Sequence, residues 1–112
     1  MEFYFKDATA GSNTDPLWST WLKGDGATNV WARPLATGSW AFVFLNAGAE
    51  VVDVVCDSEC VSKTALVGRH VTVRDLWLHK DIAVVRNLTN LTASMLPAEG
   101  GHAMYLLTPH AR

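Results

Sequence analysis

Residues 39–46 read SWAFVFLN, and this stretch decides the fold class of the 112-residue chain. Successive side chains of an extended strand point to opposite faces. One face therefore carries Trp40, Phe42 and Phe44. The other face carries Ala41, Val43 and Leu45. Because both faces are apolar, the stretch predicts a central strand that is covered on both sides.

The chain on either side of this strand keeps a period near two, and turn residues interrupt it about every eight to twelve positions. Further strands are predicted at 50–55, 71–76, 89–95 and 103–107. About six to eight strands fit the chain, so the predicted fold is an all-β sandwich. The predicted core includes Phe42, Phe44, Val52, Val54, Leu91, Met95, Tyr105 and Leu107.

The first 28 residues give a weaker pattern, in which turn-forming residues enclose a short segment with Trp18 and Trp21. A spacing of three residues suits one helical turn. We expect residues 1–26 to form an irregular or short helical extension and residues 27–112 to form the sandwich. The aromatic pair fits a platform for stacking on sugars, but a small lid or a frayed extension is the simpler interpretation.

The composition and charge of the chain exclude several classes of protein and of binding partner. Apolar residues make up 49% of the chain and charged residues 18%, a balance that excludes a disordered protein. No apolar run approaches the roughly 18 residues of a membrane span. The net charge of −2 gives no sign of a nucleic acid or membrane partner. Residues 1–7 lack a basic region followed by a long apolar one, so we expect no signal peptide in the chain as given.

Few side chains form a pattern that carries catalysis or binds a metal. His79 and Asp81 lie two positions apart and would share a face of an extended segment, as an acid and a base do. A solvated turn with a local ion pair is the simpler interpretation, because no nucleophile or orienting group is fixed nearby. His70, His102 and His110 have no metal-ligand spacing. We therefore predict no catalytic residue, no metal site and no cofactor.

Cys56 and Cys60 form the sharpest local signal. Three intervening residues are too many for a redox Cys-x-x-Cys motif, and two sulfurs alone make a poor zinc site. A disulfide that closes a tight loop is the favoured interpretation, with two free thiols as the alternative, and a disulfide would indicate an oxidising compartment. Tripeptides that begin at Asn87 and Asn90 predict two N-glycosylation sites, although such tripeptides are frequent by chance.

Several blocks follow one another along the chain. They are VWARPL at 30–35, the strand at 40–46, the loop closed by Cys56 and Cys60, VRDLWLHKD at 73–81, and GHAMYLLTP at 101–109. Their serial order resembles the C-terminal domain of α-galactosidases of glycoside hydrolase family 27. The cysteine pair is more similar to the animal lysosomal branch, which includes α-N-acetylgalactosaminidase. The RDLW and HKD blocks are more similar to plant and microbial members.

This resemblance implies an antiparallel β-sandwich with Greek-key connections, packed against a TIM barrel that holds two catalytic aspartates. No residue here matches the family's catalytic motifs, and such a barrel needs about 250 residues. The first functional hypothesis is thus a non-catalytic module that packs on a glycoside hydrolase domain, or that self-associates through an exposed apolar face. The resemblance also implies a secreted or lysosomal location.

The second hypothesis is a stand-alone carbohydrate-binding module that uses exposed tryptophans, namely Trp18, Trp21 or Trp77. Core packing is the simpler interpretation for Trp31, Trp40 and Trp77, because all three sit within strand-like patterns. An independent hydrolase is disfavoured. Retaining glycoside hydrolysis needs two carboxyl groups about 5 to 5.5 Å apart around the scissile bond, and the sequence places no such pair.

Overall fold

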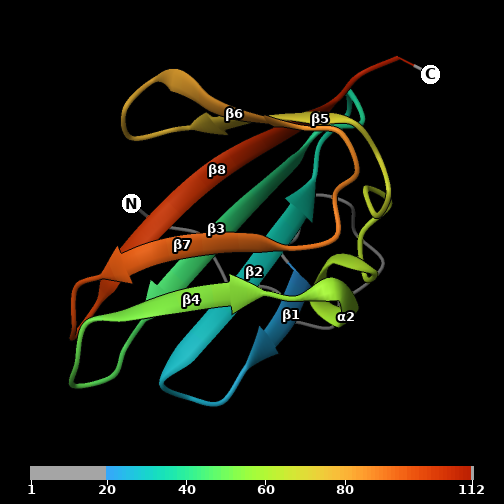
Figure 1. The fold of residues 1–112 in the computed structure, drawn as a ribbon. Helices are drawn as coiled ribbons and strands as arrows, with labels where there is room; N and C mark the ends of the chain where they lie inside the picture. Colours follow the sequence, from blue (N-terminus) through green and yellow to red (C-terminus); the bar gives the residue numbers. More distant parts are fainter. Residues whose placement is uncertain (1–19, 112) are drawn as a thin grey trace.

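The computed structural model describes residues 20–111 as two antiparallel sheets that pack face to face (Figure 1). The large sheet has the strand order β1-β2-β3-β8-β5-β6, and the small sheet is β4-β7. The strands are β1 (Thr20–Gly24), β2 (Thr28–Pro34), β3 (Trp40–Asn46), β4 (Val52–Cys56), β5 (Val71–Asp75), β6 (Lys80–Val85), β7 (Leu91–Leu96) and β8 (Gly101–Pro109). The all-β sandwich predicted from the sequence is confirmed.

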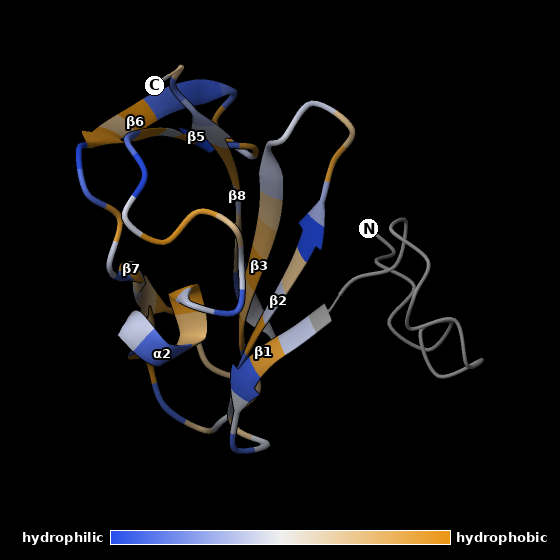
Figure 2. Cartoon of the chain, turned by 90° about the vertical axis from the view of Figure 1, so that its right-hand side faces the viewer, coloured by the Kyte–Doolittle hydropathy of each residue, from blue (hydrophilic) through white to orange (hydrophobic). Residues whose placement is uncertain are grey.

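A short helix, α2 (Ser58–Val61), follows β4. Viewed from the side, α2 and β7 lie on the same side of the large sheet (Figure 2). Within residues 20–111, no helix has the length and hydropathy needed to cross a bilayer.

Strand β8 lies inside the large sheet, where it pairs with β3 on one side and β5 on the other. To reach this position, the chain crosses to the small sheet as β4, returns as β5 and β6, and crosses again as β7. After β7, the chain returns to the large sheet as β8, which pairs with β5, the first strand of the β5–β6 hairpin. This return connection is the Greek-key arrangement that the family resemblance implies.

Strand β3 is a central strand, as its two apolar faces predict. It pairs along its whole length with both β2 and β8. Phe42 and Phe44 are fully buried between the sheets, and Tyr105 meets the Phe44 ring edge-on at 5.7 Å between centroids. Other buried members of this core include Leu22, Val30, Val54, Val71, Val73, Leu88 and Leu107, while Val52 and Leu91 are partly buried against it.

Met95 is the one predicted core residue that the structure places in solvent, with 73% of its side chain exposed. Val52 pairs with Leu96, whereas Val54 pairs with Ala93, so β7 contains one residue more than β4 between these pairs. Such a bulge reverses the alternation of side chains beyond it. Leu96, not Met95, therefore points into the core and is buried.

The N-terminal part of the described chain also departs from expectation. Residues 20–24 form strand β1, which pairs with β2, and not the helical turn that the spacing of Trp18 and Trp21 suggests. Leu22 of β1 is fully buried in the core. The strand therefore belongs to the sandwich although it lies before the predicted boundary at residue 26. Trp18 lies outside the described residues.

Candidate functional site

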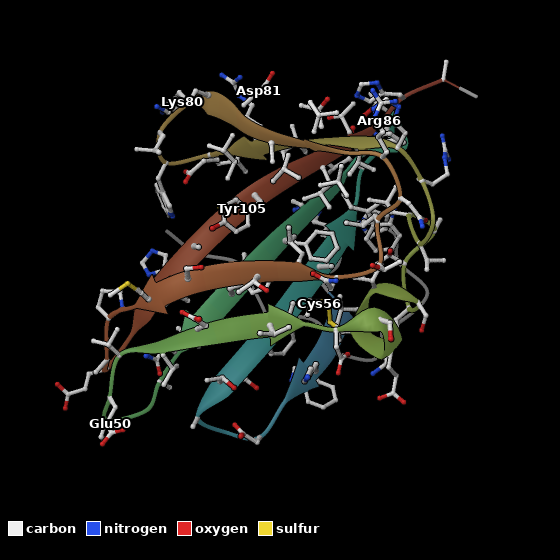
Figure 3. All side chains as sticks on the ribbon, viewed as in Figure 1. Glu50, Cys56, Lys80, Asp81, Arg86 and Tyr105 are labelled. Atoms are coloured by element: carbon white, nitrogen blue, oxygen red, sulfur yellow. A yellow bond between two sulfur atoms is a disulfide. The ribbon has the colours of Figure 1, made fainter. Side chains whose placement is uncertain are left out.

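In the part of the chain that the structure describes, Arg74 contacts both Asp81 and His79, and no hydrogen bond joins the His79 ring to Asp81. Asp81 Oδ1 accepts a hydrogen bond from Arg74 Nη1 at 3.2 Å, and Arg74 Nη2 donates to the His79 carbonyl oxygen at 2.7 Å. Asp81 and Lys80 both lie at the start of β6, in the hairpin at the edge of the large sheet (Figure 3). The expected local ion pair is present, but its cation is Arg74 on the facing strand β5.

Trp77 lies in the turn between β5 and β6 and is 48% exposed, so its assignment to the core is wrong. β5 ends at Asp75, whose carboxylate accepts hydrogen bonds from the backbone N–H groups of Trp77 and Leu78 at 2.8 and 3.0 Å. These bonds hold the turn that carries the ring. The Trp77 and His102 rings meet in an edge-to-face arrangement, with their centroids 5.4 Å apart.

Trp21 on β1 is exposed to the same degree, at 47%. Its Nε1 donates to Asn29 Oδ1 at 3.2 Å, and Lys63 Nζ lies 5.8 Å from the ring centroid. The ring lines an open cavity of about 250 Å³ together with Asp57 and Glu59. An aromatic ring beside carboxylates and ammonium groups is a combination that suits a sugar, which offers both apolar faces and hydroxyls.

Trp21 and Trp77 do not form one platform. Trp21 is on β1, and Trp77 follows β5, which lies four places along the sheet order. With neighbouring strands about 4.8 Å apart, these strands are separated by about 19 Å. Of the other tryptophans, Trp40 packs against the core and Trp31 is half-buried.

The loop after β4 is closed by a disulfide between Cys56 and Cys60, near the start of α2 (Figure 3). Asp57 caps this helix, because its Oδ1 accepts from the Cys60 N–H at 2.9 Å. Its Oδ2 pairs with Lys23 Nζ at 3.0 Å. The Cys60 hydrogen bond and the Lys23 ammonium hold the pKa of the Asp57 carboxyl below its usual value. The loop thus ties the small sheet to strand β1.

Asn87 and Asn90 are both exposed in the connection between β6 and β7. Leu88, between them, is fully buried and exchanges two backbone hydrogen bonds with Gly68 and Arg69. The anchored Leu88 keeps the two amides at the surface, which is where glycosylation requires them. Glycosylation of both sites stays a prediction.

The face of the large sheet that points away from the small sheet, here called the outer face, is apolar at its centre. Its side chains alternate with the buried core residues of the same strands. They are Trp31 and Arg33 on β2, Ala41, Val43 and Leu45 on β3, and Met104 and Leu106 on β8. Arg33 Nε is buried there without a hydrogen-bond partner among residues 20–111.

Residues 20–111 contain no group of three His, Cys, Asp or Glu side chains close enough to hold a metal ion. The three histidines weighed as metal ligands, His70, His102 and His110, do not come together. His102 lies near the β5–β6 turn, as does His79. His70 and His110 stack on each other at the opposite end of the β5–β8 pairing.

The fold matches those of solved glycoside hydrolases, all at low sequence identity. Alpha-galactosidase I from Mortierella vinacea aligns with a TM-score of 0.68 and 22% identity over 84% of this chain and 24% of that chain. The GH27 β-L-arabinopyranosidase Abp from Geobacillus stearothermophilus aligns with a TM-score of 0.68 and 17% identity over 83% of this chain and 20% of that chain. A putative α-N-acetylgalactosaminidase from Bacillus halodurans gives a TM-score of 0.68 and 12% identity over the same shares.

These alignments mean that the chain spans about a quarter or less of the length of the enzymes whose fold it shares. No curated protein matches the chain in sequence. The family model described as the alpha galactosidase C-terminal beta sandwich domain matches residues 25–107, which is most of the chain. This protein therefore belongs to the family of α-galactosidase C-terminal β-sandwich domains.

Proposed function

We propose that this chain is the non-catalytic C-terminal module of an α-galactosidase-like protein and that it packs against the catalytic domain of that protein. The observation that carries the proposal is the family match over residues 25–107. The chain also aligns with only 24% of the α-galactosidase from Mortierella vinacea, so most of that enzyme has no counterpart in this chain.

The outer face is the surface we propose for this contact. Val43 and Ala41 lie at its centre, in register with the longer side chains of Met104 and Leu106 on β8. Ala41 and Val43 are buried, and the apolar side chains around them on this face are half-buried. A contiguous apolar face that is only partly covered is typical of an interdomain contact. Arg33 Nε on the same face has no partner among the described residues. Because a buried donor without an acceptor costs free energy, an acceptor from the catalytic domain would stabilise the assembly.

The module does not select the sugar in this proposal. The similar solved structures include an α-galactosidase and a β-L-arabinopyranosidase, whose names give them different substrates. Both share this sandwich at a TM-score of 0.68. A feature common to enzymes with different substrates cannot by itself distinguish those substrates.

Two substitutions of the same type test the contact. Met104→Glu places a charge on the outer face, whereas Met95→Glu places it at a side chain that is 73% exposed on the small sheet. In the protein encoded by the complete reading frame, Met104→Glu should shorten the half-life of glycosidase activity on heating severalfold, while Met95→Glu should leave it unchanged. Equal half-lives for both variants would refute the outer face as the contact, and a complete reading frame without a catalytic domain would refute the proposed function.

The chain alone gives a second readout. Without a catalytic domain to cover the outer face, we expect residues 1–112 to sediment as a dimer or a larger species. Met104→Glu should shift that species toward the monomer, with an unchanged far-UV circular dichroism spectrum. Met95→Glu should sediment as the parent does. A monodisperse parent monomer would show that no apolar face needs a partner.

A second candidate function, carbohydrate binding, is favoured by the cavity beside Trp21. Galactose or its oligosaccharides should quench tryptophan fluorescence in a saturable way. Trp21→Ala should abolish that quenching, whereas Trp77→Ala should retain it, because the two rings are equally exposed but only Trp21 lines the cavity. Loss of the response in both variants, or no response in the parent, would contradict this assignment.

A further inference from the structure

A second cavity, of about 360 Å³, lies where β6 and β8 end and the chain leads into β5. Three segments far apart in sequence meet there: residues 67–70, Arg86 and residues 110–111. Figure 3 labels Arg86 at this end of the large sheet. The cavity is lined by two arginines and two histidines, namely Arg69, His70, Arg86 and His110, and no carboxylate of residues 20–111 lines it. In a chain with a net charge of −2, this is a local excess of positive charge.

Backbone pairing brings three of these residues together, namely Arg69, His70 and His110. Val71 of β5 pairs with Pro109 of β8, so the preceding His70 and the following His110 become neighbours. The His110 N–H donates to the His70 carbonyl oxygen at 2.8 Å. Arg69 Nη2 donates to the His110 carbonyl oxygen at 2.9 Å. Arg69, His70 and His110 are therefore held together before any ligand arrives, which reduces the entropy lost on binding.

The two imidazole rings stack almost in parallel, with centroids 3.9 Å apart and planes inclined by 20°. Thr72 also holds the His110 ring, because His110 Nε2 lies 2.6 Å from Thr72 Oγ1. Partial burial lowers the pKa of His70, and the charges of His110 and Arg86 lower it further. A negative charge in the cavity would offset these charges and favour protonated imidazole.

The Arg86 guanidinium has N–H donors that no residue of 20–111 uses. It is exposed, and it forms no hydrogen bond or ion pair with any of residues 20–111. A guanidinium presents a planar fork of N–H donors that matches the oxygens of a phosphate, a sulfate or a carboxylate. A metal cation is disfavoured here, because it would meet two fixed positive charges.

We propose that this cavity binds a single oxyanion group, held by the Arg86 guanidinium and the stacked His70 and His110 rings, with Arg69 adding positive charge. The group is either a free inorganic anion or the acidic substituent of a sugar, such as a phosphate or a carboxylate. The site is separate from the outer face and does not depend on the proposed function.

Histidine ring resonances in nuclear magnetic resonance spectra test the site with internal controls. Sodium phosphate is titrated into residues 1–112 at pH 6 and constant ionic strength. The ring resonances of His70 and His110 should shift with saturation, while those of His79 and His102 should not. With sodium sulfate, whose charge does not change over this range, the affinity should be severalfold higher at pH 5.5 than at pH 7.5, because protonated imidazoles are the better partners of an anion. Equal shifts at all four histidines, or a response without saturation, would refute the site.

Arg86→Gln supplies the decisive variant, and Arg74→Gln is its control. Arg74 lies on the same sheet but pairs with Asp81 outside the cavity. Arg86→Gln should weaken phosphate binding at least tenfold, whereas Arg74→Gln should bind as the parent does. Unchanged binding by Arg86→Gln would overturn the proposal.

Three further titrations distinguish the two sources of the anion. Galactose 6-phosphate and galacturonate are compared with inorganic phosphate, and neutral galactose serves as the blank. Saturation by either acidic sugar at a lower concentration than phosphate assigns the site to a sugar substituent. Equal or better binding of inorganic phosphate assigns it to the free anion. A response to galactose equal to that of its acidic derivatives would contradict an oxyanion site.

Discussion

Asp53 and Met95 meet across the small sheet, where the Met95 backbone N–H donates to Asp53 Oδ1 at 2.7 Å. Met95 has a φ of 52°, in the left-handed region that residues other than glycine, asparagine and aspartate rarely enter. The bond thus holds the extra residue of the β7 bulge in a conformation that the chain would not choose alone. This local geometry decides which of two neighbouring side chains reaches the core.

Leu96→Ala and Met95→Ala should therefore differ sharply. Leu96 is buried in the core, so its truncation should cost about 2 to 5 kcal/mol. Met95 is mostly exposed, so its truncation should cost less than about 0.5 kcal/mol. Urea denaturation of both variants measures the difference. A larger loss for Met95→Ala would mean that the strand keeps a regular alternation without a bulge.

Phe42→Ala removes a ring that is fully buried and lies 6.4 Å from Phe44 between centroids. The lost transfer free energy and the cavity left behind should together lower the free energy of unfolding by about 3 to 5 kcal/mol. Denaturation monitored by tryptophan fluorescence gives the value. A loss below about 1 kcal/mol would show that the space between the sheets is not closely packed.

Asp57→Asn tests the pH dependence of the cap on α2. The carboxyl pKa is lowered in the folded state, first by the Cys60 N–H and then by Lys23. A carboxyl with a depressed pKa stabilises the fold above its unfolded pKa of about 3.9, and this contribution is lost as the pH falls through the lower folded value. The variant should be less stable than the parent at pH 7, and the difference should shrink as the pH falls below about 3.9. A difference that persists at the acid end would implicate packing instead of charge.

The Cys56–Cys60 bond closes a loop with a sequence separation of four, so it restricts little of the unfolded chain. Replacing both cysteines with serine should cost less than the roughly 2 to 4 kcal/mol typical of disulfides that close longer loops. Peptide mass spectrometry without reduction should find the pair linked in protein made in an oxidising compartment. Recovery of two alkylatable thiols from such protein would refute the assignment.

Residues 1–112 should not release nitrophenol from an aryl α-galactoside. Asp75 and Asp81 are both engaged in the β5–β6 hairpin, where Asp75 accepts from two backbone N–H groups and Asp81 pairs with Arg74. Glycoside hydrolysis requires two carboxyl groups around the scissile bond, whereas these two carboxylates bind donors of their own hairpin. Sustained turnover that is abolished by Asp75→Asn or Asp81→Asn would reveal a catalytic pair.

The sequence predicts best the parts of the fold in which burial leaves a periodic pattern. Strand β3 is apolar on both faces because it has a neighbour on each side, and its residues report this directly. Strand β6 escapes prediction for the opposite reason. It lies at the sheet edge with its side chains almost all exposed, so backbone pairing with β5 holds it and no burial pattern marks it.

The two cavities show a different limit of sequence reasoning. Trp21 can be recognised as a candidate because an aromatic residue near turn signals is visible in the sequence. His70 and His110 are separated by 40 positions, and only the register of β5 against β8 makes them neighbours. Long-range strand pairing creates such clusters, and no local spacing indicates it.

The position of β8 has a consequence for synthesis on the ribosome. β8 is translated after the other seven described strands, yet it joins β1-β2-β3 to β5-β6 in the large sheet. Until β8 has been made, no strand joins β3 to β5, and the facing edges of these two strands stay unpaired. At about 5 to 20 residues per second this interval lasts several seconds. The large sheet is therefore completed only after β8 has been translated, and until then its unpaired edges are open to pairing with other chains.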